Sequence, residues 1–524
     1  MKTLFIFLPL FVSIGASASM NSWQLFQDDP KAYLQGHPMK TDGNEVELNS
    51  YSNSPFSRHD IDSGDFVTAK LQTYDQILKH AKSVAPKVSV FAAESDLSVK
   101  VADFFDSKDF ERSGATPLTR LEDLDSRDLT HATLLEAPWA GSYWPIYRGV
   151  IAARYASNRF PGEDLAWSTY KYAVGGDNSL GNIVERDNQG EIDILSPSEK
   201  YDLLIGKPRK TGTTAAGFLT PSMWEQGEHY RDDAGKVATW MGICHGWAAA
   251  AFMVPRPSQA IQAASPAVTA PLTFYPDDIK GLISQLWAEA DYPSSFLGDR
   301  CDSKEPKVDP ETGRLTDPKC FAVNPGLWHL VVVNQIGLAK RSFVIDASYD
   351  WEVWNQPVSG YAFHYFNPQT GQQADNAKAV TIAREIYTKD KFAKYRSPAA
   401  SAFVGVEMKL SYVTESDPRH AITDSPKNDA IENVTYLYDL ELDRNGEILG
   451  GEWYRNEHPN FLWLPASDVH VTSSGDSQIS GESGWTPDQL LPPFWRDIAI
   501  STAKESGEPL SAILDPLVAA SHKE

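Results

Sequence analysis

The stretch Met241–Val254, MGICHGWAAAAFMV, carries the strongest local signal in the chain. Its four consecutive alanines favour a helix and Pro255 ends it, so we expect Cys244 in the first helical turn. The unpaired backbone N–H groups and the helix dipole stabilise a thiolate there and lower the pKa of the thiol. Cys244 is therefore a candidate nucleophile. The alternative is a small core residue, because free cysteines are often buried.

The other two cysteines, Cys301 and Cys320, flank a loop rich in Pro, Asp and Lys. A disulfide between them would pin this loop and leave Cys244 free. Two alternatives stay open: three reduced thiols, or a bridge that includes Cys244 and silences it.

The N-terminus is typical of a secretory signal. Residues 1–18 combine Lys2, an apolar run and the small-residue cleavage site Ala16-Ser17-Ala18, so we expect a secreted or periplasmic protein without a membrane span. The formal net charge of the 524-residue chain is −23. So acidic a chain argues against nucleic acid as a partner, because nucleic acid requires clustered Lys and Arg.

The remaining pattern divides the chain into three regions. Residues 19–135 are mostly helical in pattern, with helices expected over 65–81 and 97–105, and are either an accessory region or a pro-segment. Residues 136–465 form the expected core, with a capped helix from Ser196, an amphipathic helix from Asp277 and strands over 404–413, 434–442 and 448–454. Residues 466–524 are typical of a Ser/Gly-rich linker and a tail.

Alternation over 327–333 and 341–346 predicts two further strands. If they form an antiparallel hairpin in which Asn334 opposes Arg341, His329 lies directly across from Asp346. A carboxylate there would orient the imidazole as a general base for Cys244. Each residue alone has an ordinary structural interpretation; together they form a Cys-His-Asp constellation.

The motifs GICHGWA, GLWHLVVVNQIG and FVIDASYDWEVWNQPV resemble the transglutaminase core, and more closely the transglutaminase-elicitor family. PWAGSYWP, SPSEKYD and LYDLELDRNGEILGGEW also fit that family, and the resemblance spans residues 136–465. It implies an α+β, papain-like fold with a catalytic helix packed on an antiparallel sheet. It also implies a γ-glutamyl transfer from glutamine to lysine or a primary amine, with Cys244 as nucleophile, His329 as base and Asp346 as orienting acid.

Other elements of the site are less defined. The oxyanion-stabilising or substrate-binding side chains are expected among Trp224, Trp240, Trp247 and Trp328. The chemistry requires no cofactor, no metal ligand set is expected, and a calcium requirement stays open. The carboxylates Asp439, Glu441 and Asp443 lack EF-hand spacing, which favours a solvated strand face.

Three other functions compete with the transglutaminase. A papain-like cysteine protease or a glutamine deamidase would use the same cysteine, and a catalytically silent secreted elicitor or binding protein would use only the fold. The expected partners of the transglutaminase are protein substrates with accessible glutamine and lysine, or small primary amines. The oligomeric state does not follow from the sequence.

Overall fold

A computed structural model describes residues 103–162, 166–208, 217–301, 303, 305–349, 352–479 and 484–522. The predicted signal sequence and the predicted helix over 65–81 lie outside the described residues, as does most of the helix predicted over 97–105. No helix in the described ranges is both long and apolar enough to cross a bilayer.

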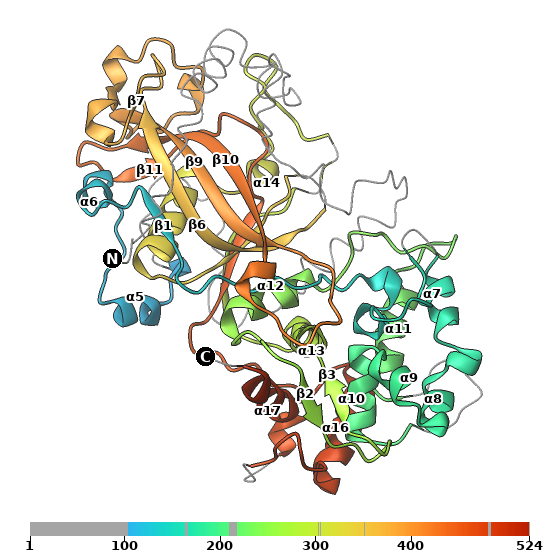
Figure 1. Cartoon of the computed structure of the whole chain (residues 1–524). Coiled ribbons are helices and arrows are strands. Elements are labelled where there is room, and N and C mark those ends of the chain that lie inside the picture. The colour runs from blue at the N-terminus through green and yellow to red at the C-terminus, as the bar shows by residue number, and fades with distance from the viewer. Residues whose placement is uncertain are drawn as a thin grey trace, which may run out of the picture.

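A ten-stranded antiparallel sheet forms the upper body of the molecule in Figure 1. Its main path runs β11-β10-β9-β6-β5-β12-β4, while β1 and β7 pair with β6 and β8 pairs with β9. The strands are β1 His131–Thr133, β4 Ser294–Gly298, β5 Val344–Asp346, β6 Asn355–Phe366, β7 Gln373–Ala374, β8 Ile382–Ala383, β9 Ala402–Thr414, β10 Ala430–Leu442, β11 Ile448–Gly450 and β12 Phe461–Pro465; β2 Ile261–Ala263 and β3 Leu272–Phe274 form a separate pair.

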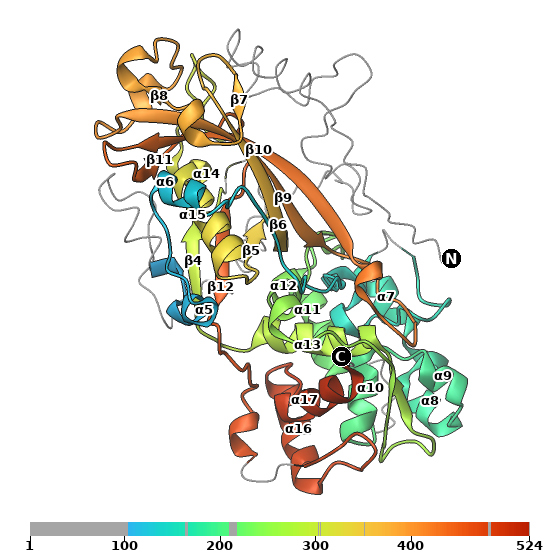
Figure 2. The same ribbon diagram turned by 60° about the vertical axis from the view of Figure 1, so that its left-hand side comes forward.

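Most helices gather below the sheet, where the green helices of the middle of the chain lie beside the red C-terminal ones (Figure 2). The α-helices are α5 Ser107–Ser113, α6 Leu121–Ser126, α7 Trp167–Ala173, α8 Leu180–Arg186, α9 Gln189–Asp193, α10 Pro197–Ile205, α11 Thr220–Tyr230, α12 Cys244–Met253, α13 Pro276–Glu289, α14 Pro318–Phe321, α15 Pro325–Val332, α16 Pro493–Glu505 and α17 Ser511–Ser521. Shorter 3-10 turns span Ile146–Arg148, Val150–Ala152, Gly176–Asn178, Ala377–Ala379, Arg384–Ile386, Ala393–Tyr395, Pro426–Asn428 and Asp476–Gln478, and a π-helical turn, η5, covers Val333–Leu338.

The hydrophobic core has two main clusters, on opposite faces of the β5–β12 region of the sheet. Val344 and Trp463 belong to the first cluster, which includes α12 and α13, whereas Ile345 and Leu462 belong to the second, which includes α15. This division follows from strand geometry, because successive side chains point to opposite faces. The α+β class predicted from the sequence is confirmed.

Several local predictions are also confirmed. The side chain of Ser196 accepts a hydrogen bond from the backbone of Glu199 in a full capping box at the start of α10. The helix predicted from Asp277 is α13, and β10 and β11 form the expected hairpin, where Gly446 adopts a positive φ of 81°.

The strand predicted over 327–333 is wrong, because these residues form most of α15 and the start of η5. Asn324 caps α15 by accepting a hydrogen bond from the Gly326 backbone, and Pro325 occupies the first turn. Every residue of α15 is buried, and all but His329 are apolar or glycine. A short apolar run of this kind fits a buried strand and a buried helix equally well.

The C-terminal region is also more ordered than the predicted linker and tail. Residues 493–505 and 511–521 form α16 and α17, and α17 packs against α13. On the N-terminal side of the predicted core, β1 pairs with β6 and so extends the main sheet. The boundaries expected at 135/136 and 465/466 therefore fall within continuously packed structure.

Candidate functional site

Cys244 is the first residue of α12, as predicted. The preceding turn is held by the aromatic segment, since the Ile243 N–H donates to the Tyr143 carbonyl over 2.8 Å. A Cβ on Gly242 would lie 2.4 Å from that same carbonyl oxygen, so this approach requires glycine. Gly246 has the matching role within α12, because a Cβ there would lie 2.2 Å from the Ser284 carbonyl of α13. The glycines of GICHGWA thus let α12 pack closely on both sides.

The thiol of Cys244 points toward the start of β6. The Asn355 side-chain amide donates to Sγ over 3.4 Å, and the thiol donates to the Val353 carbonyl over 3.9 Å. Only 2% of Cys244 is exposed. The sulfur is therefore covered by the chain that enters β6.

Asn355 is held in one orientation by Trp463. The indole N–H of Trp463 donates to Oδ1 of Asn355 over 2.9 Å. An indole nitrogen can only donate, so the oxygen of the amide must face Trp463 and its NH₂ group must face the sulfur. Both side chains are buried.

Asp346 lies on the same face of the sheet. It pairs directly with Asn355 across β5 and β6, which places the two side chains side by side. Its Oδ1 accepts hydrogen bonds from the hydroxyl of Ser348 over 2.8 Å and from the Trp354 backbone over 3.0 Å, and its Oδ2 accepts one from Asn460 over 3.2 Å. Asp346 is thus a firmly held buried carboxylate beside the thiol's amide partner.

The pKa of the Cys244 thiol contradicts the expectation from its helix position. Burial raises this pKa to about 12, and the negative charges of Glu415 and Asp346 add to the effect. The hydrogen bonds from Asn355 lower the pKa but do not outweigh burial. The thiol is therefore neutral at pH 7 in this arrangement, because desolvation exceeds the contribution of the helix start.

His329 is not brought to the thiol, so the predicted cross-strand pair with Asp346 is wrong. Its Nδ1 is hydrogen-bonded with the hydroxyl of Tyr438 at 2.9 Å, and its ring packs edge-on against Phe363. These neighbours belong to the second core cluster, on the sheet face away from Cys244. Burial lowers the pKa of His329 to about 3, so the imidazole is neutral.

The four predicted tryptophans are all buried, and the thiol's hydrogen bonds go to Asn355 and Val353 instead. Trp247 donates to the Trp139 carbonyl, Trp224 packs against Trp167, and Trp328 packs against Tyr436 in the second core cluster. Trp240 lies in the first core cluster.

Asp346 was predicted as a site residue, but Asn355 and Trp463 were missed. Asn355 lies within the quoted motif FVIDASYDWEVWNQPV, where its position after the aspartate was a usable signal. Trp463 had none.

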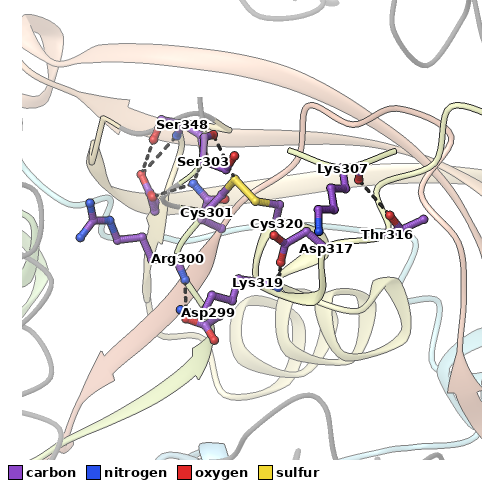
Figure 3. The surroundings of a disulfide bond; sticks show 12 residues. Asp299, Arg300, Cys301, Ser303, Lys307, Thr316, Asp317, Lys319, Cys320 and Ser348 are labelled. Carbon is purple, nitrogen blue, oxygen red and sulfur yellow. Dashed lines mark hydrogen bonds between the residues drawn. A yellow bond between two sulfur atoms is a disulfide. The ribbon is translucent and has the colours of Figure 1, made fainter. Parts of the chain in front are cut away.

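The disulfide between Cys301 and Cys320 is present (Figure 3). Cys244 is free. Among the described residues, no group of three His, Cys, Asp or Glu side chains is placed to hold a metal ion.

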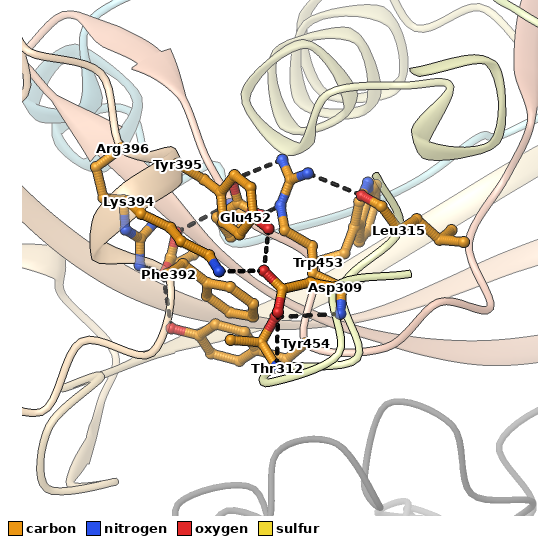
Figure 4. A network of polar contacts seen from close by, with 12 residues as sticks. Asp309, Thr312, Leu315, Phe392, Lys394, Tyr395, Arg396, Glu452, Trp453 and Tyr454 are labelled. Atoms are coloured by element: carbon orange, nitrogen blue, oxygen red, sulfur yellow. Dashed lines mark hydrogen bonds and ion pairs between the residues drawn. The ribbon is translucent and has the colours of Figure 1, made fainter. Parts of the chain in front are cut away.

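The carboxylates of β10 do not form the solvated face that the sequence predicted. Arg396 is 5% exposed and forms ion pairs with Asp390, Asp439 and Glu441. An adjoining network joins Asp309 to Lys394 and Tyr395 and joins Arg314 to Glu452 (Figure 4). The strand carboxylates are inward-facing because each has a cationic or hydrogen-bonding partner. Asp443 instead closes the hairpin turn by accepting from the backbone of Asn445 and Glu447.

Comparison with known proteins agrees with the resemblance seen in the sequence. Residues 224–480 match the family model described as transglutaminase elicitor, which confirms the predicted family over this region. The chain therefore carries a transglutaminase-elicitor region. The matched range includes Cys244, Asp346, Asn355 and Trp463.

Among solved structures, the GP42 transglutaminase from Phytophthora sojae aligns with 77% of this chain and 98% of its own, at 22% identity and a TM-score of 0.45. No curated protein sequence matches the chain.

Proposed function

We propose that this protein is a secreted transglutaminase-type acyltransferase with Cys244 as its nucleophile. The observation that carries the proposal is the placement of the one free thiol of the described residues, at the start of α12, where it accepts from an oriented amide whose cross-strand neighbour is a held carboxylate. A nucleophile, a hydrogen-bond donor and an acidic group on one face are the groups that acyl transfer needs. The family match over 224–480 supports the same class of reaction.

In the proposed reaction, Cys244 Sγ attacks the side-chain carbonyl carbon of a glutamine. The C–N bond breaks, ammonia leaves with the thiol proton, and a thioester remains. A lysine or small primary amine then attacks the thioester, forms the isopeptide bond and returns a proton to the sulfur. We assign the donor facing the oxyanion to Asn355 and the proton-accepting carboxylate to Asp346. His329 has no role in this proposal.

The thiol must first become accessible, because it is 2% exposed and its neighbours favour the neutral form. A glutamine side chain can reach Sγ only if the backbone at Val353, whose carbonyl accepts from the thiol, moves aside. This requirement fits a protein that keeps its nucleophile covered until a substrate binds.

The test is incorporation of a fluorescent primary amine into a glutamine-rich protein such as casein, with release of ammonia. We expect Cys244→Ala to abolish it, and Asp346→Asn to lower the rate by about tenfold or more without loss of fold. Peptide mapping distinguishes the alternatives: new N-termini without amine adducts would establish a protease, and glutamate in place of glutamine even with excess amine would establish a deamidase. No modification of any glutamine by the folded protein would refute the proposal.

A further inference from the structure

We infer that Trp463 is a positioning residue for Cys244, acting through the side-chain amide of Asn355. The inference deepens the proposed function, since it concerns the same thiol. It starts from two hydrogen bonds in series, from Trp463 Nε1 to Asn355 Oδ1 at 2.9 Å and from Asn355 Nδ2 to Cys244 Sγ at 3.4 Å.

The sheet register explains how two residues 108 positions apart meet. Trp463 on β12 pairs with Val344 on β5, and Asp346 on the same strand pairs with Asn355 on β6. Residues two apart on a strand share a face, so Trp463 and Asn355 both point toward α12. The indole therefore reaches across β5 to the amide.

The hydrogen bond decides which end of the amide faces the sulfur. If the amide of Asn355 were reversed, its NH₂ group would face the N–H of Trp463, and two donors would meet without an acceptor. Its oxygen would then face Cys244, where it could only accept from the neutral thiol. In the observed orientation the amide donates to Sγ, and donors to a thiolate favour the ionised form.

The hydrogen bond that Trp463 orients toward Sγ stabilises the charged thiolate more than the neutral thiol. A hydrogen bond to an ionised acceptor is about twice as strong as one to a neutral acceptor. Trp463 therefore favours the thiolate, and the same donor would face the oxyanion of a tetrahedral intermediate. Removal of the indole N–H should raise the thiol pKa even where it leaves the packing intact.

The experiment compares Trp463→Phe with a matched control, Trp453→Phe. Trp453 is also buried and also uses its indole N–H, in a 2.8 Å hydrogen bond to the Val323 carbonyl, but it belongs to the second core cluster. The readout is the rate of Cys244 modification by iodoacetamide as a function of pH, mapped by mass spectrometry. We expect Trp463→Phe to slow the reaction by about tenfold at a fixed pH, the size of one pKa unit.

Whether the rate of Cys244 modification falls or rises distinguishes a lost positioning hydrogen bond from a loosened core. A loosened core exposes the buried thiol and speeds its modification, whereas a lost donor slows it. In an Asn355→Ala background, Trp463→Phe should have no further effect on the pH profile, because residues that act through one another are not additive. A Trp463→Phe profile equal to that of Trp453→Phe, or an additive double variant, would overturn the inference.

The pH profile of Cys244 modification also tests the role of Trp463 independently of the acyl-transfer proposal, because it needs no substrate. Loss of amine incorporation in every assay, with the predicted thiol profile, would refute the proposed function alone. Normal incorporation with an unchanged profile in Trp463→Phe would refute the role of Trp463 alone.

Discussion

Replacement of His329 by asparagine tests whether this histidine is a buried neutral group or a catalytic base. Asparagine can keep the hydrogen bond to Tyr438 but does not titrate. Burial holds the pKa of native His329 at about 3, against an ordinary value of about 6.5 in the unfolded chain. The stability contribution of the neutral ring is therefore fully present above pH 6.5 and is lost as the pH falls toward 3.

The magnitude follows from this shift. At pH 5 the unfolded histidine is protonated while the native one is neutral, which costs the native state roughly 2 kcal/mol relative to pH 7.5. The His329→Asn variant escapes this cost. The stability advantage of wild type over His329→Asn should thus shrink by roughly 2 kcal/mol between pH 7.5 and pH 5. The contributions of the other titrating groups are the same in both proteins, so they cancel in the stability difference between wild type and variant.

Urea unfolding followed by tryptophan fluorescence, at both pH values, measures this change. His131→Asn, at an exposed position of β1, provides the control for replacing a histidine outside the core. The folded His329→Asn variant should keep amine incorporation at pH 7.5. A stability difference that does not change with pH, or a folded variant without any activity, would refute the structural placement of His329.

Three further predictions concern the scaffold. Double replacement of Cys301 and Cys320 by serine should lower the free energy of unfolding by about 3 kcal/mol, because the bridge closes a loop of sequence separation 19. Calorimetry measures this loss of stability, and a variant as stable as wild type would contradict the prediction. Arg396→Leu should cost about 3–5 kcal/mol, since it leaves buried carboxylates without their cation; denaturant unfolding shows this, and a neutral effect would count against the network. Ser196→Ala should cost about 1 kcal/mol through the lost cap of α10, and a Tm equal to wild type would exclude it.

The sequence alone determined the elements whose signals are local. The alanines before Pro255 predict α12 and place Cys244 at its start, the Ser196 box predicts α10, and the turn at Gly446 predicts the β10–β11 hairpin. Propensities, caps and turns act within a few residues, so they can be seen without the fold. The pairing of Cys301 with Cys320 was expected from the loop between them, and the structure decided it against the alternatives of three reduced thiols or a bridge to Cys244.

The tertiary structure decided which residues meet at the thiol. Asn355 and Asp346 face Cys244 only because β5 and β6 pair in one register, and Trp463 joins them from a strand 108 residues beyond Asn355. Register and face depend on long-range pairing, which no local pattern encodes. The position of His329 was predicted wrongly, because its segment is otherwise apolar and buried on every side and so has no exposed polar face to show whether its period is that of a helix or a strand.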